Sequence, residues 1–243
     1  MLVCIVLIVV TRSPLPNPSD IEAVLFDAGG VLLLPDIAVG QEALASFGCQ
    51  FGTEEWERAF YTGSVYVDQV EEVHWPAVRR EIAAALGVDD DRLDEAVPIV
   101  ERLILEMPWM AVIGATEVLS ALSAAGFLLG VVSNATGTVE SELAGLGVCS
   151  VEDGSVPRVG IVVDSHHLGV EKPDPRIFEF ALESLGVEAS KAVYVGDTVR
   201  FDVTGARTAG LFPIHMDPFG FCGADDHAHI ERLSELQSWL APF

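Results

Sequence analysis

The sequence predicts an α/β protein with a doubly wound parallel sheet and an inserted α-helical module. Short apolar segments that resemble buried strands alternate with amphipathic helical segments through most of the chain. This alternation is typical of a parallel sheet that is covered by helices on both faces. One stretch, residues 37–106, shows helical periodicity without a convincing strand, so we interpret it as an insertion.

These patterns divide the chain into three parts. Residues 1–20 form an N-terminal extension or linker, residues 21–36 and 107–243 form the α/β core, and residues 37–106 form the helical module. Residues 1–10 are almost wholly apolar but far too few to span a bilayer, which requires about 20 residues. No basic residue precedes them as in a signal peptide, so we expect an extra strand or a start codon upstream of the true one.

The first half of the chain contains one strand and several helices. Residues 23–26 are a buried strand, and Ser64 to Val67 is ambiguous between strand and helix. Apolar residues fall on one helical face between 78 and 86, where Gly87 ends the helix. A second helical face runs from Leu93 to Ile104.

The second half returns to alternation. A helical stripe at 118–125 precedes a strand, and a helix beginning at Asp174-Pro175 carries its apolar face to Leu185, because aspartate caps a helix and proline suits its first turn. The remaining predicted strands are residues 127–132, 160–163, 192–195 and 212–215.

Composition excludes several kinds of partner. The 243 residues are 50% hydrophobic, which provides a sizeable core, and carry a formal net charge of −24. Such a surface repels nucleic acid and anionic membranes, so we expect neither as a partner. The cysteines, at positions 4, 49, 149 and 222, form no C-x-x-C pair, which favours thiols in a reducing compartment and argues against a zinc site.

A set of polar residues stands where the predicted strands end: Asp27, Ser133, Asp164 and Asp197. The carboxyl ends of parallel strands lie at one edge of a sheet, so these side chains can converge there. Asp202 follows Asp197 by five residues, and Lys172 follows Asp164 by eight. Clustered carboxylates suit Mg²⁺, and a lysine and a serine beside them can hold phosphoryl oxygens.

The order of these residues resembles the haloacid dehalogenase-like hydrolase superfamily over residues 22 to 240. Four segments in order carry the similarity, namely 27–32 (DAGGVL), 131–134 (VVSN), 172–175 (KPDP) and 196–202 (GDTVRFD). The resemblance implies a Rossmann-like core in which the inserted helices are a type 1 cap.

The resemblance also implies roles for individual residues. Asp27 would be the nucleophile that forms an aspartyl-phosphate. Mg²⁺ would bind the carboxylates of Asp27 and Asp197 and the carbonyl of Gly29, while Asp202 would hold Asp197 or a metal-bound water. The expected phosphate ligands are Ser133, Lys172, Asn134 and the backbone near Ala28.

One position departs from the family pattern. Phosphatases of this family carry a second aspartate two residues after the nucleophile, where this chain has Gly29. General acid–base help of that kind contributes about 10²- to 10⁴-fold in rate. The enzyme could therefore act on good leaving groups, use another acid such as Asp36 or a cap residue, or bind phosphate with little turnover.

We therefore expect a cytoplasmic, Mg²⁺-dependent phosphoric monoester hydrolase that acts on a small phosphorylated metabolite as a monomer or homodimer. One alternative is a regulatory phosphate-binding protein. Another is a 2-haloacid dehalogenase, which also lacks the second aspartate but needs no metal, whereas Gly196-Asp197 with Asp202 argues for one.

Several polar groups have other interpretations. Asp164 is expected to cap a turn. The stretch from Asp225 to His229 has metal-binding composition, but we expect a solvated loop because it follows glycine-rich sequence. Candidates for binding a second anionic group of the substrate are Arg58, Arg79 and Arg80.

Overall fold

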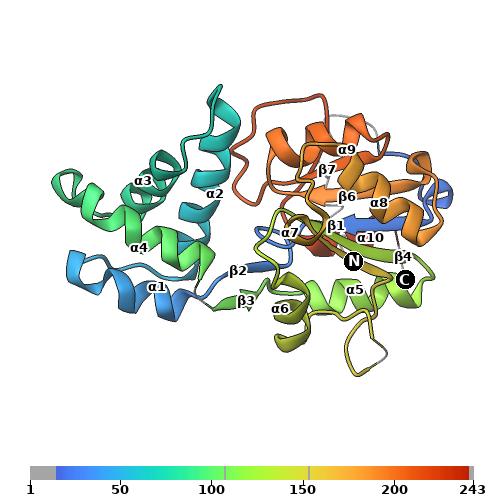
Figure 1. The fold of residues 1–243 in the computed structure, drawn as a ribbon, viewed down its shortest axis with the longest axis horizontal. Helices are drawn as coiled ribbons and strands as arrows, with labels where there is room; N and C mark the ends of the chain where they lie inside the picture. The colour runs from blue at the N-terminus through green and yellow to red at the C-terminus, as the bar shows by residue number, and fades with distance from the viewer. Residues whose placement is uncertain (1–14, 107, 153, 241–243) are drawn as a thin grey trace, which may run out of the picture.

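The computed structural model describes residues 15–106, 108–152 and 154–240, and its centre is a six-stranded parallel sheet with the order β5-β4-β1-β6-β7-β8. Every neighbouring pair in this sheet is parallel, so all six carboxyl ends lie at one edge (Figure 1). The strands are β1 (Ala23–Phe26), β4 (Leu128–Ser133), β5 (Ile161–Asp164), β6 (Ala192–Gly196), β7 (Phe212–Met216) and β8 (Ala228–Ile230).

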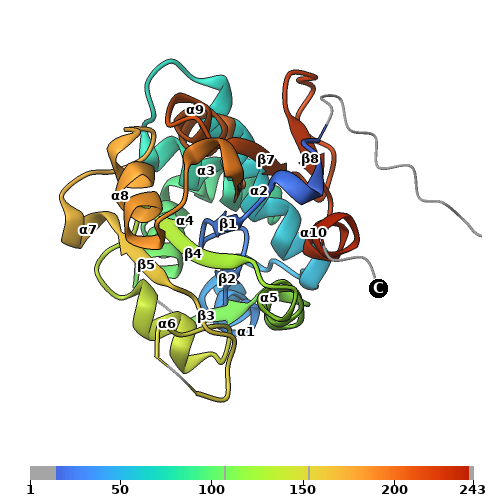
Figure 2. The ribbon, with the colours of Figure 1, turned by 90° about the vertical axis from the view of Figure 1, so that its right-hand side faces the viewer.

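Helices cover both faces of the sheet (Figure 2). Alternate residues of β1 point to opposite faces, as a strand requires: Val24 and Phe26 pack in the cluster that contains α5 and α10, whereas Ala23 and Leu25 pack with α8 and α9. The core helices are α5 (Ala115–Ala124), α6 (Val139–Gly145), α7 (Ser165–Leu168), α8 (Arg176–Leu185), α9 (Thr204–Thr208) and α10 (Leu233–Leu240).

The inserted helices form a separate lobe, at the left of Figure 1. They enclose their own hydrophobic cluster, which includes Trp56, Ile82 and Leu103. A two-stranded antiparallel sheet of β2 (Leu33–Pro35) and β3 (Trp109–Ala111) joins this lobe to the core. The helices of the lobe are α1 (Ile37–Leu44), α2 (Thr53–Gln69), α3 (Trp75–Ala85) and α4 (Leu93–Leu105).

Short irregular helices complete the described chain. Four are 3₁₀ turns, and the π-helix η5 (Val199–Val203) follows β6. The 3₁₀ turns are η1 (Pro18–Asp20), η2 (Ala45–Phe47), η3 (Asp90–Arg92) and η4 (Ala189–Lys191).

The predicted fold class is confirmed, and the five predicted strands correspond to β1, β4, β5, β6 and β7. Residues 64–67 belong to α2, which resolves their ambiguity. The expectation that residues 225–229 form a solvated loop is wrong, because His227 is buried and residues 228–230 form the edge strand β8. The prediction for residues 1–10 lies outside the described residues.

Within the described ranges, no helix is both long and apolar enough to cross a bilayer.

Candidate functional site

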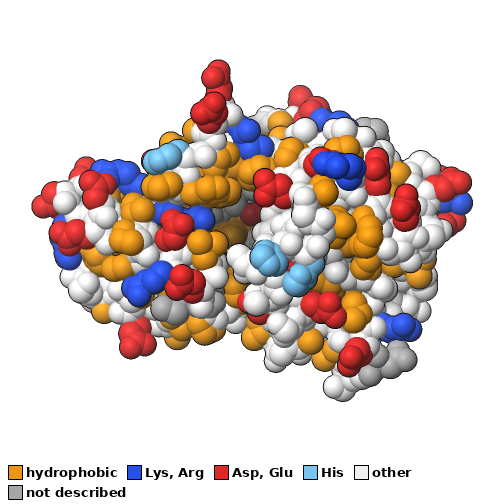
Figure 3. All heavy atoms as spheres, in the orientation of Figure 1, with side chains coloured by type: hydrophobic (Ala, Val, Ile, Leu, Met, Phe, Trp, Pro, Cys, Tyr) orange, Lys and Arg blue, Asp and Glu red, His pale blue; other side chains and the backbone are white. Residues whose placement is uncertain are grey.

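A cleft of about 600 Å³ opens between the cap and the carboxyl edge of the sheet. The space-filling view shows the hollow between the two lobes, rimmed by hydrophobic side chains (Figure 3). Its floor includes Asp27, Ser133, Lys172, Asp197 and Asp202. The structure therefore brings together the carboxylates, the lysine and the serine that lie far apart in the sequence.

Lys172 is the centre of the charged network. Its ammonium nitrogen lies 2.7 Å from Oδ2 of Asp27 and 2.7 Å from Oδ1 of Asp202. Burial opposes the charge on Lys172, but the two carboxylates outweigh burial and raise its pKa. The lysine is therefore a fixed cation that compensates two buried acids.

Asp202 is the most thoroughly hydrogen-bonded of these acids. Its Oδ2 accepts bonds from the backbone N–H of Thr198 at 3.0 Å and from the Thr198 hydroxyl at 2.5 Å. Although burial acts in the opposite direction, Lys172 and Thr198 together lower the pKa of Asp202. Asp202 thus stays ionised and positions Lys172 and the turn after β6.

Tyr194 joins the same network from the middle of β6. Its hydroxyl accepts a hydrogen bond from Lys172 at 2.9 Å and lies 3.0 Å from both Asp202 Oδ1 and the carbonyl of Val132. Sequence reasoning missed this residue. The available signal was a tyrosine inside an otherwise apolar strand, two residues before the Gly196-Asp197 turn.

Asp197 is hydrogen-bonded to a hydroxyl, whereas Asp202 is paired with a lysine. Its Oδ2 accepts a hydrogen bond from the hydroxyl of Ser64 in α2, at 2.7 Å. Burial, followed by repulsion from Asp202 and Asp27, raises the pKa of Asp197 well above its ordinary value. Burial also raises the pKa of Asp27, against the opposing effect of Lys172.

The three carboxylates fit a hard divalent cation. One oxygen from each of Asp27, Asp197 and Asp202 lies within 4.8 Å of the others. One lysine cannot neutralise three buried acids, and oxygen ligands of this type suit Mg²⁺. A cation held here would favour the ionised form of Asp197, whose pKa burial and the two neighbouring acids raise.

The predicted phosphate ligands have different local roles. The backbone N–H of Ala28 donates to Asp27 Oδ1 at 2.7 Å, and Ser133 is hydrogen-bonded to the same carboxylate. The side-chain amide of Asn134 donates to the carbonyl of Lys172 at 3.0 Å and accepts from its N–H at 2.7 Å. The Asn134 side chain thus holds the backbone of Lys172, and Asn134 also lines the cleft, so its contact with phosphate stays a prediction.

The turn after β1 requires glycine at position 30. Gly30 has φ +73°, and a Cβ there would lie 2.4 Å from Oδ2 of Asp197. Gly29 is different, because a Cβ there would meet only Trp109, at 3.7 Å, which is an ordinary contact. Position 29 therefore has room for the Cβ of a side chain, whereas position 30 does not.

The lobe of inserted helices, the cap, contacts the site through side chains on one face of α2. Tyr61 donates a hydrogen bond to the carbonyl of Gly30 at 2.6 Å, Ser64 binds Asp197, and Asp68 accepts from the N–H groups of Val199 and Arg200 at 2.8 and 2.7 Å. The spacing of these three α2 residues puts them on one helical face. Sequence reasoning missed all three, because their partners lie more than 30 positions away.

Other predicted candidates are spread over the molecule. Arg79 lines the cleft, whereas Arg58 pairs with Glu54 and Arg80 pairs with Asp94 on exposed surface. Asp36 caps α1 by accepting from the N–H groups of residues 38 and 39, rather than facing the cleft. Asp164 caps α7 through the N–H of His166, as expected for a turn residue.

Comparison with curated proteins identifies phosphatases among the relatives. The chain is 29% identical over 203 residues to an N-acetylmuramic acid 6-phosphate phosphatase of Pseudomonas aeruginosa, covering 78% of this chain and 79% of that protein. It is 47% identical over 55 residues to a glyceraldehyde 3-phosphate phosphatase of Methanopyrus kandleri, covering 23% and 24%. In the matches to the Methanopyrus kandleri protein and to several other curated relatives, the chain spans only about a quarter to about half of the relative's length.

Solved structures share the fold. A HAD phosphatase from Thermococcus onnurineus matches with a TM-score of 0.56 and 21% identity, covering 91% of this chain and 99% of the other. A 2-haloacid dehalogenase from Pseudomonas syringae pv. Tomato DC3000 matches with a TM-score of 0.53 and 26% identity, covering 91% and 98%.

The family of haloacid dehalogenase-like hydrolases matches residues 21–210, a range that contains the whole cap and all the residues of the charged network. The chain therefore belongs to the haloacid dehalogenase-like hydrolases.

Proposed function

We propose that the protein is a Mg²⁺-dependent phosphatase that hydrolyses a small phosphomonoester through an aspartyl-phosphate on Asp27. The observation that carries this proposal is the Asp27 carboxylate at the floor of the cleft, 2.7 Å from a buried lysine and beside two further acids. A nucleophile, a fixed cation and a set of hard oxygen ligands are the parts that phosphoryl transfer needs.

In the first step, an oxygen of Asp27 attacks phosphorus and the bond to the leaving oxygen breaks. Lys172 and the hydroxyl of Ser133 hold charge on the phosphoryl oxygens. In the second step, water attacks the same phosphorus, which releases inorganic phosphate and restores the Asp27 carboxylate. Mg²⁺, held by Asp27, Asp197 and the carbonyl of Gly29, would supply the positive charge that stabilises the transferring group.

Gly29 limits the leaving group. No side chain at this position can protonate the departing oxygen or activate the water, so solvent must supply and take these protons. Acyl, aryl and anomeric phosphates leave without much protonation. We infer that substrates of these kinds turn over fastest.

The cap wall indicates what the rest of the substrate carries. Its lining is mainly apolar, with Phe60, Trp75 and Ile82 among its residues, and it includes one buried cation, Arg79. Within the described ranges, Nε of Arg79 is buried and has no hydrogen-bond partner. We infer that Arg79 binds a second anionic group of the substrate, such as a carboxylate.

A pair of neighbouring variants tests this assignment. Arg79→Met should lower the preference for an acidic over a neutral phosphomonoester by about 10-fold, because a charge-assisted hydrogen bond contributes about 1.5–3 kcal/mol. Arg80→Met removes the adjacent arginine outside the cleft and should leave that preference unchanged. Equal preference ratios in the two variants would contradict the role of Arg79.

Phosphate release from p-nitrophenyl phosphate and acetyl phosphate tests the activity itself. We expect turnover with Mg²⁺, none in EDTA, and none in Asp27→Asn with Mg²⁺. Phosphate binding without turnover in the folded wild-type protein would favour the regulatory alternative, and EDTA-resistant release of halide from a 2-haloacid would favour the dehalogenase.

A further inference from the structure

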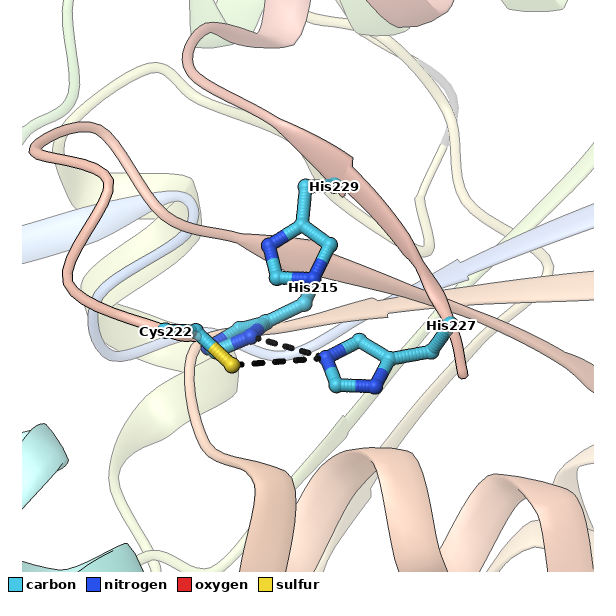
Figure 4. A group of neighbouring side chains, drawn as sticks. All are labelled: His215, Cys222, His227 and His229. Atoms are coloured by element: carbon cyan, nitrogen blue, oxygen red, sulfur yellow. Dashed lines mark hydrogen bonds between the residues drawn. The ribbon is translucent and has the colours of Figure 1, made fainter. Parts of the chain in front are cut away.

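A second group of metal-ligating side chains lies at the edge of the sheet, outside the charged network of the cleft. It contains His215 of β7, Cys222 in the following loop, His227 just before β8, and His229 of β8 (Figure 4). One ligand atom from each residue lies within 4.8 Å of the others. His215 and His227 are buried, and the side chain of His229 is only 14% exposed.

The outward ring nitrogen of each histidine faces an oxygen atom. Nε2 of His215 lies 3.1 Å from the carbonyl of Asp197, Nδ1 of His227 lies 2.7 Å from a carboxylate oxygen of Asp226, and Nδ1 of His229 lies 3.5 Å from Asp217. Carbonyl and carboxylate oxygens only accept, so each of these nitrogens carries the proton. The other nitrogen of each ring then presents a lone pair to the centre of the cluster.

The inward atoms are closer than neutral acceptors should be. Nδ1 of His215 lies 3.2 Å from Nε2 of His227, and Sγ of Cys222 lies 3.8 Å from the same atom. Facing lone pairs at this distance repel unless a positive charge lies between them. A shared proton could join one pair of nitrogens, but within the described residues Nε2 of His229 is also buried and has no hydrogen-bond partner.

A tetrahedral zinc ion satisfies all four atoms at once. Zinc bonds of about 2.0–2.1 Å to nitrogen and about 2.3 Å to sulfur place nitrogen ligands about 3.3 Å apart, and nitrogen about 3.6 Å from sulfur. The observed separations of 3.2 and 3.8 Å agree with this geometry. We propose that His215, Cys222, His227 and His229 form a structural zinc site.

The surroundings of the cluster support this assignment. The oxygens bound to the outward nitrogens fix the tautomer and orientation of each ring, which is how metal-binding histidines are held. Asp217 also accepts the N–H groups of Phe221 and Cys222, at 2.8 and 2.9 Å, so it shapes the loop that carries the thiolate. Three imidazoles and one thiolate suit zinc better than Mg²⁺ or Ca²⁺.

The proposed site connects parts that the catalytic machinery uses. His215 supports the backbone carbonyl of Asp197, and the loop from Asp217 to Cys222 meets the cap: Phe219 packs edge-on against Tyr61 and lies under the guanidinium of Arg58. A bound zinc ion would therefore stiffen the turn after β6 and the surface on which α2 rests. With four protein ligands the site is closed, as in structural zinc centres.

Metal analysis of the full chain, purified without chelator and with any histidine tag removed, tests the proposal. After dialysis against excess Mg²⁺, which occupies the carboxylate site of the cleft, we expect about one zinc per chain. Cobalt substitution should give a thiolate-to-cobalt absorption band that disappears in Cys222→Ser and persists in Cys49→Ser.

Variants locate the site. His229→Ala should weaken zinc affinity by about 100-fold or more, and Asp226→Asn by about 10-fold, because it replaces the carboxylate partner of His227 with a neutral amide. Asp225→Asn removes the neighbouring exposed acid and should retain wild-type affinity. The proposal is overturned if metal-free wild-type protein, titrated with Zn²⁺ against a chromophoric chelator, binds none, or if Co²⁺ gives no thiolate band. Neither readout depends on phosphatase activity.

Discussion

Gly29 limits the chemistry that Asp27, the proposed nucleophile, can perform. Lys172 and Ser133 contact the Asp27 carboxylate, so the parts that hold the phosphoryl group are present. The position two residues after Asp27 is Gly29, which has no side chain to donate a proton. The proposed reaction would therefore depend on the acidity of the leaving alcohol and on unassisted attack by water.

Restoring a carboxylate at this position should increase turnover of poor leaving groups. A Cβ at Gly29 makes only ordinary contact with Trp109, so the first atom of an aspartate side chain fits at this position. We expect kcat on an alkyl phosphate to rise by about 10²-fold, the lower end of general acid–base contributions, with a smaller gain on p-nitrophenyl phosphate. Steady-state kinetics with both substrates measures the difference.

Gly29→Ala is the matched control, because it adds the Cβ without the carboxylate. An equal gain in Gly29→Ala and Gly29→Asp would mean that backbone rigidity, rather than acid catalysis, was limiting. No gain in Gly29→Asp would show that another group already supplies the proton.

The raised pKa of Asp197 predicts how the stability of the folded protein depends on pH. Its pKa in the folded state lies well above the ordinary value of 3.8, so between these values the folded protein binds a proton that the unfolded chain releases. The stabilisation in EDTA that this proton provides should therefore be fully present below pH 3.8 and be lost as the pH rises through the raised pKa of Asp197. Burial raises the pKa of Asp27 and contributes in the same direction.

Thermal denaturation in EDTA and in Mg²⁺ measures this effect. Mg²⁺ favours the ionised acids, so the increase in Tm that it causes should grow with pH over the same range. Asp197→Asn cannot ionise at this position and should show a weaker decline in EDTA. Equal slopes in the wild type and Asp197→Asn would contradict the pKa of Asp197 derived from the structure.

Some residues of the site could be predicted from the sequence and others could not. Asp27, Lys172 and Asp197 stand in segments whose spacing resembles a known family, and the structure places them together. Tyr194 and Ser64 act through contacts across the fold, and such contacts leave no local pattern. The sequence motif also gave no sign that the Asn134 amide hydrogen-bonds both backbone groups of Lys172.

At the scale of elements, helix α2 carries side chains that bind the cap to the core, in addition to the chain connection through β2 and β3. Asp68 accepts two backbone N–H groups at the start of η5, which holds the cap against the turn that carries Asp197 and Asp202. Burial raises the pKa of Asp68 to about 6, so this carboxylate is ionised at pH 7 and can accept both bonds. Asp68 is therefore one of three α2 side chains, with Tyr61 and Ser64, that bind the cap to the core.

Asp68→Ala should loosen this connection. Hydrogen bonds to a charged group contribute about 1.5–3 kcal/mol, so the free energy of unfolding should fall by roughly that amount and KM should rise. Asp94→Ala, which removes an exposed acid paired with Arg80 on the outside of the cap, should cost less than about 1 kcal/mol. Urea denaturation of both variants makes the comparison, and equal losses would show that Asp68 does not hold the cap.

Elements with continuous apolar runs were predictable, and short ones were not. Strand β1 is fully buried, so its residues are all apolar and its sequence reveals it. Strands β2 and β3 have three residues each, too few for a periodic pattern. Strand β8 contains His229 and follows the acidic stretch 225–226, so it resembled a surface loop although it pairs with β7.

At the scale of the whole molecule, the arrangement favours a small substrate. The net charge of −24 repels polyanions, while the one buried lysine at the cleft floor and Arg79 on its wall provide local positive charge. A small anion can reach these two groups in a cleft of about 600 Å³. Closure of the cap would then exclude bulk water from the phosphoryl group.

The central claim is that Asp27 carries the phosphoryl group, and rapid-quench mass spectrometry tests it most directly. Because Gly29 cannot activate water, dephosphorylation should be slow and the phosphorylated enzyme should accumulate. With acetyl phosphate and Mg²⁺, acid quenching within the first turnover should place a phosphoryl group on the peptide that contains Asp27. Phosphate release with that peptide unmodified at every time point, or turnover retained in Asp27→Asn, would contradict the mechanism.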